Sequence, residues 1–257
     1  YNLMIKNYLN DKLQNQENKK FLIMIDCANG ATSNHIQNIF KNSNLIDILT
    51  IYDQPSGKNI NYKCGATHVN PLIEQIKFHN SVEKNKIDLG VALDGDGDRA
   101  IFVTPSGKII NGDENLYILS RFKKEYKNYN GPVVGTIMTN HGIKSAYKEI
   151  GIDFYETDVG DKFVYRKMSD LNAEIGGEAS GHIIITDIFD TPICDGIITL
   201  VNLLEVLSIT KLNLDSLKDI TSKLITPSKL INFAVIDKNK FMNNKNNQKI
   251  FSDLEKM

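Results

Sequence analysis

The sequence predicts an α/β fold with two consecutive domains whose sheets are flanked by helices. Short apolar runs of strand length alternate with longer stretches that repeat with helical period, which is typical of βαβ units. This order is interrupted by a turn at Pro105, Ser106 and Gly107, and it then begins again. A chain of 257 residues has ample material for the buried cores of one large or two medium domains.

The first domain is predicted to follow a helix at the start of the chain. Residues 87–93 form a near-continuous apolar run, which indicates a strand buried on both faces. Pro71 suits the first turn of a helix, where its missing N–H is harmless. The predicted strands cover residues 21–25, 45–52, 87–93, 100–103 and 108–110, and the predicted helices cover residues 1–14, 33–40 and 71–78.

The second domain repeats this pattern. Gly151 marks the end of one helix, and the pair Gly176 and Gly177 follows a strand. Residues 195–208 form the strongest amphipathic helix, because their apolar side chains fall on one face. The predicted strands cover residues 133–138, 153–156 and 173–175, and the predicted helices cover residues 113–126, 141–150, 160–168, 195–208 and 214–224.

The last part of the chain predicts the beginning of something new. Residues 231–236 start a further element, and the polar tract at residues 238–249 is predicted to be a mobile loop. The chain begins at Tyr1 without an initiator Met and stops at Met257, so we expect it to be a fragment of a longer protein.

Composition excludes some classes of partner. With 30 basic and 31 acidic residues the net charge is −1, so there is no global field to attract nucleic acid or an anionic membrane. The three cysteines are widely spaced and form no CxxC pair, which fits reduced thiols inside a cell. No signal peptide core and no apolar run of bilayer length occur, and we therefore expect a soluble cytoplasmic protein.

An acidic loop carries the strongest chemical signal. Asp94, Asp96 and Asp98 alternate with glycines, Arg99 follows them, and apolar runs flank the loop on both sides. Crowded carboxylates repel one another, and a hard divalent cation with oxygen ligands relieves that repulsion. The glycines let the backbone turn tightly enough for the carboxylates to converge. The loop therefore predicts a Mg²⁺ site, since Mg²⁺ takes few protein carboxylates and keeps positions open for phosphate or water.

Two other interpretations of this loop are weaker. An EF-hand beginning at Asp94 needs Gly at its sixth position and a bidentate Glu at its twelfth, and the chain has Arg99 and Pro105 there. An ordinary hairpin turn explains the Asp-Gly pairs. It does not explain three acids beside an Arg.

A second loop, residues 177–182, combines Glu178, Ser180 and His182 with flanking glycines. Glu178 and Ser180 are two residues apart in a segment predicted to be extended, so we expect them to point the same way. Together they can accept and donate hydrogen bonds to neighbouring hydroxyls, as sugar recognition requires. Because glycine turns with polar neighbours are common, the motif alone leaves a purely structural interpretation open.

Together the two loops resemble the α-D-phosphohexomutase family, in which a metal loop DGDGDR precedes a sugar loop GE-x-SGH in the next domain. The resemblance implies mixed sheets and covers essentially the whole chain. Four further segments are similar to the bacterial phosphoglucosamine mutase branch: residues 26–31, 59–68, 159–164 and 177–184. The implied parts are a linking helix from a missing first domain (1–18), domain 2 (19–111), domain 3 (112–224), and a hinge with the start of domain 4 (225–257).

The resemblance also implies an activity. Such enzymes move phosphate reversibly between the C6 and C1 oxygens of glucosamine phosphate through a phosphoserine and a bisphosphorylated sugar, for amino-sugar nucleotides and the cell wall. The resemblance makes Asp94, Asp96 and Asp98 the Mg²⁺ ligands, with Arg99 supporting them. The implied substrate-binding residues are Glu178, Ser180, His182 and Lys162.

The chain departs from the family pattern in ways that matter for activity. It contains neither a serine loop like T-A-S-H-N-P nor a phosphate loop like R-x-S-G-T. We therefore expect the isolated chain to be catalytically inactive and to bind metal weakly. Ala179 stands at the position that best separates the subfamilies and so does not identify the sugar. Glu156 and Asp158 would repel phosphate if they faced the cleft.

Three functions remain open at this point. The first is a fragment of phosphoglucosamine mutase, and the second is a fragment of a phosphoglucomutase or phosphomannomutase. The third is a non-catalytic module that binds a hexosamine or hexose phosphate. A haloacid-dehalogenase phosphatase fits less well, because its D-x-D-x-T/V motif would require Thr or Val where Asp98 stands. The oligomeric state cannot be inferred from the sequence.

Overall fold

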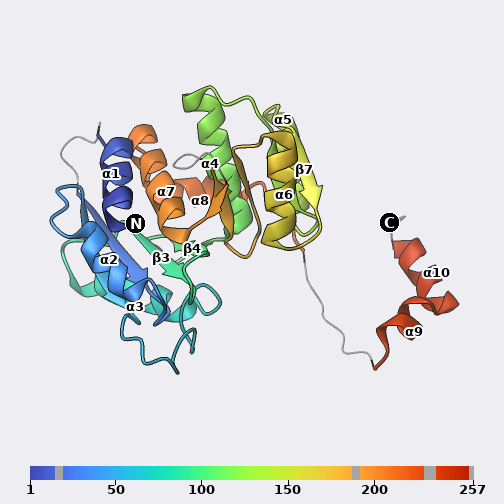
Figure 1. The fold of residues 1–257 in the computed structure, drawn as a ribbon, viewed down its shortest axis with the longest axis horizontal. Helices are drawn as coiled ribbons and strands as arrows, with labels where there is room; N and C mark the ends of the chain where they lie inside the picture. The colour runs from blue at the N-terminus through green and yellow to red at the C-terminus, as the bar shows by residue number, and fades with distance from the viewer. Residues whose placement is uncertain (15–19, 187–191, 229–235, 255–257) are drawn as a thin grey trace. The chain divides into compact units, whose positions relative to one another are not determined.

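The computed structural model describes residues 1–14, 20–186, 192–228 and 236–254. These residues divide into one compact unit at Tyr1–Thr226 and a second at Pro227–Met257, and each is described by itself. The first unit has the predicted α/β architecture, with two five-stranded sheets covered by helices (Figure 1). No single described helix is long and apolar enough to cross a membrane, and only one bent pair of helices, Gly196–Thr210 and Leu214–Ser222, passes by length and composition.

The first sheet has the order β2-β1-β3-β4-β5, with β2, β1 and β3 parallel and β4 and β5 antiparallel. Every residue of β1 and β3 is buried, which confirms that their apolar runs are interior strands. The strands are β1 (Phe21–Asp26), β2 (Ile46–Ile51), β3 (Leu89–Leu93), β4 (Ala100–Val103) and β5 (Ile109–Ile110), with helices α1 (Asn2–Lys12), α2 (Ser33–Phe40) and α3 (Asn70–Val82).

The second sheet has the order β10-β9-β8-β6-β7 and is also mixed, with β7, β6 and β8 parallel and β9 and β10 antiparallel. Its strands are β6 (Val133–Thr136), β7 (Phe154–Thr157), β8 (Ile175–Gly177), β9 (Ile183–Ile185) and β10 (Ile193–Cys194). The helices are α4 (Gly112–Lys127), α5 (His141–Glu149), α6 (Asp161–Leu171), α7 (Gly196–Thr210) and α8 (Leu214–Ser222).

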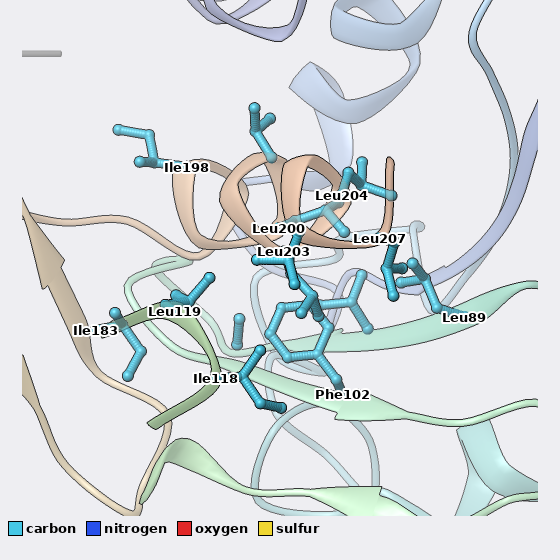
Figure 2. Packing of buried hydrophobic residues seen from close by; sticks show 14 of the residues in the cluster. Leu89, Phe102, Ile118, Leu119, Ile183, Ile198, Leu200, Leu203, Leu204 and Leu207 are labelled. Carbon is cyan, nitrogen blue, oxygen red and sulfur yellow. The ribbon is translucent and has the colours of Figure 1, made fainter. Parts of the chain in front are cut away.

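Helix α7 joins the two sheets into one core. It contacts β4 of the first sheet and β9 of the second, and also packs against α1 and α4. Figure 2 shows its leucines beside Phe102 and Leu89 of the first sheet and Leu119 of α4. All residues from Gly196 to Ser208 are buried. The prediction of a single apolar face was therefore wrong, because a helix enclosed by two sheets and two helices buries its whole circumference.

The structure corrects two further predictions. The strand β10 has only two residues and lay in no predicted element. The tract at residues 238–249 was predicted to be a mobile loop, but it contains α9 (Lys238–Met242) and the first half of α10 (Lys245–Leu254). Asp237 caps α9 by accepting the Lys240 N–H at 2.9 Å, and the rings of Phe241 and Phe251 meet edge to face. Most of the element predicted at residues 231–236 lies outside the described residues.

Candidate functional site

The acidic loop, residues 94–99, connects two antiparallel neighbours, and Leu93 of β3 pairs with Ala100 of β4. Asp94 organises the loop from inside. Its side chain is 2 % exposed, and its Oδ1 accepts the N–H groups of Gly97 at 3.2 Å and Arg99 at 3.1 Å. Gly97 has φ +81°, a conformation that glycine adopts without strain. The side chain of Asp94 therefore fixes the backbone of the loop from within.

The three carboxylates converge as predicted. Ligand oxygens of Asp94, Asp96 and Asp98 lie within 4.8 Å of one another, with Asp96 exposed and Asp98 half-buried. Burial raises the pKa of Asp98; His182 opposes this shift, and the charges of Asp94 and Asp96 add to it. Arg99 Nε lies 2.7 Å from Asp94 Oδ2 and 3.9 Å from Asp98 Oδ1. The guanidinium of Arg99 is therefore closer to Asp94 than to Asp98.

This donor set fits a hard cation. Asp98 Oδ1 is buried, and it has no hydrogen-bond partner within the described part of the chain. A buried carboxylate oxygen without a partner is costly unless something positive occupies the space beside it. Three oxygen donors of this kind suit Mg²⁺, which leaves its remaining positions to water or phosphate.

The second loop, residues 177–182, is a tight turn and not the extended segment that was predicted. The Gly181 N–H donates to Glu178 O at 3.0 Å and closes the turn. Ser180 Oγ and Glu178 Oε2 nevertheless both reach His182 Nδ1, at 3.4 and 3.1 Å. Glu178 Oε1 accepts the Gly160 N–H at 2.8 Å. The buried Glu178 thus has both oxygens engaged, while Ser180 is exposed.

Electrostatics couple Glu178 and His182. The hydrogen bond from His182 lowers the pKa of Glu178, and the backbone N–H of Gly160 adds to the effect. The same hydrogen bond raises the pKa of His182, against the opposing effect of burial, and Asp98 raises it further. The pair therefore favours a carboxylate facing an imidazolium.

His182 also brings the two loops together. Its Nε2 lies 3.2 Å from Asp98 Oδ2, so one ring contacts a predicted metal ligand and a predicted sugar ligand. An isolated antiparallel bridge joins Arg99 to His182, and the Ala100 N–H donates to Gly181 O at 3.1 Å. Two loops that are about 80 residues apart in the sequence form one continuous site.

Further contacts fix the two loops to elements of the second domain. The Gly196 N–H, at the start of α7, donates to Gly97 O at 2.8 Å, and Cys194 Sγ lies 3.1 Å from Asp98 O. The Gly112 N–H, at the start of α4, donates to Ala179 O at 3.1 Å. Sequence reasoning missed the role of all three positions, because each contact reaches a backbone carbonyl and carries no motif.

Lys162 stays a prediction. It is exposed, and its Nζ lies 4.8 Å from the centre of the Phe163 ring. No recorded contact among the described residues joins it to either loop, although Gly160 of the same segment donates to Glu178. Glu156 is paired with Lys144 of α5 at 3.0 Å, which offsets one of the acids near this segment.

Two domain models of one protein family match the chain. Residues 1–107 match the model described as phosphoglucomutase/phosphomannomutase, alpha/beta/alpha domain II. Residues 111–226 match the model described as phosphoglucomutase/phosphomannomutase, alpha/beta/alpha domain III. The two matches place the acidic loop in one domain and the Glu178 turn in the next.

Named relatives point in the same direction. The chain is 40% identical to phosphoglucosamine mutase of Histophilus somni (strain 2336) over 213 residues, which cover 83% of this chain and 46% of that protein. It is 38% identical to phosphoglucosamine mutase of Limosilactobacillus reuteri over 236 residues, 91% of this chain and 50% of that protein. The chain thus spans about half the length of the relatives it matches.

Solved structures agree in fold. An N-acetylglucosamine-phosphate mutase in a substrate complex superimposes with a TM-score of 0.73 at 21% identity, over 95% of this chain and 54% of that one. Aspergillus fumigatus N-acetylphosphoglucosamine mutase in complex with GlcNAc-6P and magnesium gives a TM-score of 0.72 at 18% identity, over 95% of this chain and 57% of that one. At these identities the likeness concerns the fold alone.

Proposed function

Because the chain belongs to the phosphoglucomutase/phosphomannomutase family, the α-D-phosphohexomutases, we propose that it forms the metal-binding and sugar-binding half of a phosphoglucosamine mutase. The complete enzyme interconverts glucosamine 6-phosphate and glucosamine 1-phosphate in the cytoplasm, for amino-sugar and cell-wall synthesis. The observation that carries this proposal is the contact of His182 with both Asp98 and Glu178. Through this one ring, the proposed cation-binding loop and the proposed hydroxyl-binding turn lie next to each other.

Asp94, Asp96 and Asp98 are the proposed Mg²⁺ ligands. The bound ion would neutralise negative charge on the oxygens of the transferred phosphoryl group. Asp94 holds the loop in shape through its two backbone contacts. Asp96, which is exposed, and Asp98, whose buried Oδ1 has no hydrogen-bond partner among the described residues, supply negative charge for the ion. Arg99 pairs with the second oxygen of Asp94 at 2.7 Å and so helps to hold that side chain in place.

The Glu178 turn is the proposed sugar-binding element. Ser180 is exposed and can donate to or accept from a hydroxyl directly. The buried Glu178 and half-buried His182 lie behind it and already hydrogen-bond each other. A bound sugar would therefore share or exchange these hydrogen bonds. Lys162, two residues after Gly160, is proposed as a phosphate contact.

Phosphoryl transfer also requires a nucleophile. The family reaction uses a phosphoserine, and this chain has no segment that resembles the serine loop. We therefore expect no mutase turnover from the 257-residue chain alone, since positioning without a nucleophile cannot complete the transfer. The turnover assay with glucosamine 6-phosphate and Mg²⁺ tests this point directly.

A chimera tests the proposed function. Residues 1–226 would replace the matching segment of Limosilactobacillus reuteri phosphoglucosamine mutase, which supplies the remaining domains. We expect Mg²⁺-dependent formation of glucosamine 1-phosphate, and loss of that activity in the same chimera with Asp96→Asn. A folded chimera that binds Mg²⁺ and still fails to turn over would contradict the proposal.

The sugar is the remaining choice within the family. Structures with this fold include a putative phosphomannomutase as well as N-acetylglucosamine-phosphate mutases. The same chimera, assayed with glucose 1-phosphate and mannose 1-phosphate, separates these substrates from glucosamine 6-phosphate. Preference for either hexose phosphate would move the chain to the phosphoglucomutase or phosphomannomutase branch.

A further inference from the structure

Two segments of the first domain lie directly beneath the acidic loop. The first is the turn at residues 26–31, which contacts Gly95. The Ala31 N–H donates to Gly95 O at 2.8 Å, and Gly30 lies so close that a Cβ there would collide with the same carbonyl oxygen. The space around Gly95 therefore depends on where this turn sits.

The second segment, residues 59–66, closes on the loop from another side. A Cβ on Gly95 would lie 2.7 Å from Ile60 Cδ1 and 2.8 Å from Asn61 Nδ2, so Gly95 is enclosed. The Ala66 N–H donates to Leu93 O at 2.9 Å, at the residue just before Asp94. Position 95 requires glycine because its neighbours leave no room for a Cβ. Position 97 favours glycine because its φ is positive.

A single buried carboxylate ties these two segments together. Asp26, at the end of β1, is fully buried, and its Oδ1 accepts the Ala28 N–H at 2.9 Å. Its Oδ2 accepts the Gly65 N–H at 2.8 Å. The two segments also meet directly, because the Asn61 N–H donates to Ala28 O at 2.9 Å. Each oxygen of Asp26 thus holds a different segment against the acidic loop.

We propose that Asp26 is a positioning residue for the acidic loop, acting through the segments at residues 26–31 and 59–66. It has no recorded contact with Asp94, Asp96 or Asp98. It sets the position of the backbone that carries them, from Leu93 to Gly95. This inference rests on the proposed function in one respect: it assumes that the acidic loop binds Mg²⁺.

The variant Asp26→Asn isolates this role. The amide keeps the size and shape of the carboxyl group but retains a single acceptor oxygen, so one of the two backbone N–H groups loses its partner. Because supporting partners of metal ligands typically change affinity by 10–100-fold, we expect calorimetric Mg²⁺ titration to show about a tenfold loss. The measurement is made well below the unfolding temperature of the variant.

Ser120→Ala is the matched control. Ser120 is also fully buried, and its hydroxyl contacts Leu116 O at 2.6 Å and Tyr147 Oη at 3.0 Å within the second domain. The Ser120→Ala change removes buried hydrogen bonds without altering a contact of residues 26–31 or 59–66. We expect this variant to lower the unfolding temperature while leaving Mg²⁺ affinity within about twofold of the wild type.

A second measurement needs no metal. In the metal-free protein, amide hydrogen exchange reports opening of the loop through Gly97 and Arg99, whose N–H groups donate to Asp94. We expect Asp26→Asn to speed their exchange about tenfold relative to wild type and to Ser120→Ala, a protection loss of the size that one supporting contact provides. Unchanged exchange together with unchanged affinity would overturn the positioning role.

The two measurements separate the proposals. If the wild type fails to bind Mg²⁺ while Asp26→Asn still speeds exchange at Gly97 and Arg99, the metal assignment falls and the positioning role stands. If Mg²⁺ binds and Asp26→Asn changes neither quantity, the positioning role falls and the metal assignment stands.

Discussion

The acidic loop and the Glu178 turn solve the problem of holding a carboxylate in different ways. In the acidic loop, Asp96 is exposed and Asp98 retains a buried oxygen without a partner among the described residues, so negative charge is left available. In the turn, both oxygens of Glu178 are already engaged by Gly160 and His182. On the proposed function, the first loop could receive a cation directly, whereas the second would have to exchange hydrogen bonds to receive a hydroxyl.

Their supports differ as well. The acidic loop rests on two segments of its own domain, around Gly30 and Ala66, and also accepts the Gly196 N–H of the second domain. The turn is held by Gly160 before α6 and Gly112 at the start of α4, both in its own domain, and by Ala100 of the first sheet. The two loops therefore rest on different segments, and their supports can be changed separately.

The largest expected effect removes charge from the acidic loop. Asp96 is exposed, so Asp96→Asn should leave the unfolding temperature unchanged. Mg²⁺ affinity should fall by more than about 100-fold, beyond the range typical of supporting residues, because a ligand is lost. Calorimetric titration checks this. Ser180→Ala, an exposed change in the other loop, is the control and should leave Mg²⁺ affinity intact.

Opposite responses to pH would sharpen the comparison. Burial raises the pKa of Asp26 from 3.8 to about 6, so the stabilisation that comes from its protonation is present below pH 3.8 and is lost as pH rises through about 6. Hydrogen bonding from His182 lowers the pKa of Glu178 from 4.5, so its contribution is present above pH 4.5 and is lost as pH falls through the lowered pKa.

Urea unfolding at several pH values measures both contributions. The unfolding free energy of the wild type minus that of Asp26→Asn should fall by up to about 3 kcal/mol as pH rises from 3.8 to about 6. Wild type minus Glu178→Gln should change in the opposite direction, rising with pH below the ordinary Glu range. Curves of the same slope would show that the two carboxylates are not held differently.

A pair of glycine substitutions would break the two supports separately. A Cβ at Gly30 would collide with Gly95 O, and one at Gly112 would collide with Glu178 O. Each Gly→Ala change should reduce the unfolding free energy by about 1–3 kcal/mol through overpacking. Gly30→Ala should weaken Mg²⁺ binding, and Gly112→Ala should weaken glucosamine 6-phosphate binding while sparing Mg²⁺.

Gly57→Ala is the control for this pair. Gly57 has φ +76° and no neighbour within reach of a Cβ, so the change strains the backbone without touching either loop. It should lower stability and leave both ligand affinities unchanged. Equal loss of Mg²⁺ affinity in all three variants would contradict separate supports.

The smallest expected effect concerns the contact between the acidic loop and β10. Cys194 Sγ lies 3.1 Å from Asp98 O, and a thiol is a weak donor. Cys194→Ala should reduce the unfolding free energy by about 1 kcal/mol or less and Mg²⁺ affinity by less than about fivefold. Cys194→Ser, which keeps a donor, should restore the affinity. A loss as large as that of Asp96→Asn would mean that the loop depends on the second domain.

The sequence alone determined the alternation of strands and helices, the two mixed-sheet domains implied by the family resemblance, and the clustering of Asp94, Asp96 and Asp98. These features depend on local periodicity and on residues within one short loop, where neighbours along the chain are neighbours in space. Glycines between the aspartates made their convergence a local matter.

Only the tertiary structure decided how the site is assembled. The burial of α7 on all sides, the contact of His182 with Asp98, and the two oxygens of Asp26 holding separate segments all join residues far apart in the sequence. Backbone donors such as Gly65 and Gly160 leave no side-chain signature, so a pattern of residue types cannot show which carboxylate they satisfy. Packing of the two sheets around one helix brings those donors and acceptors within hydrogen-bond distance.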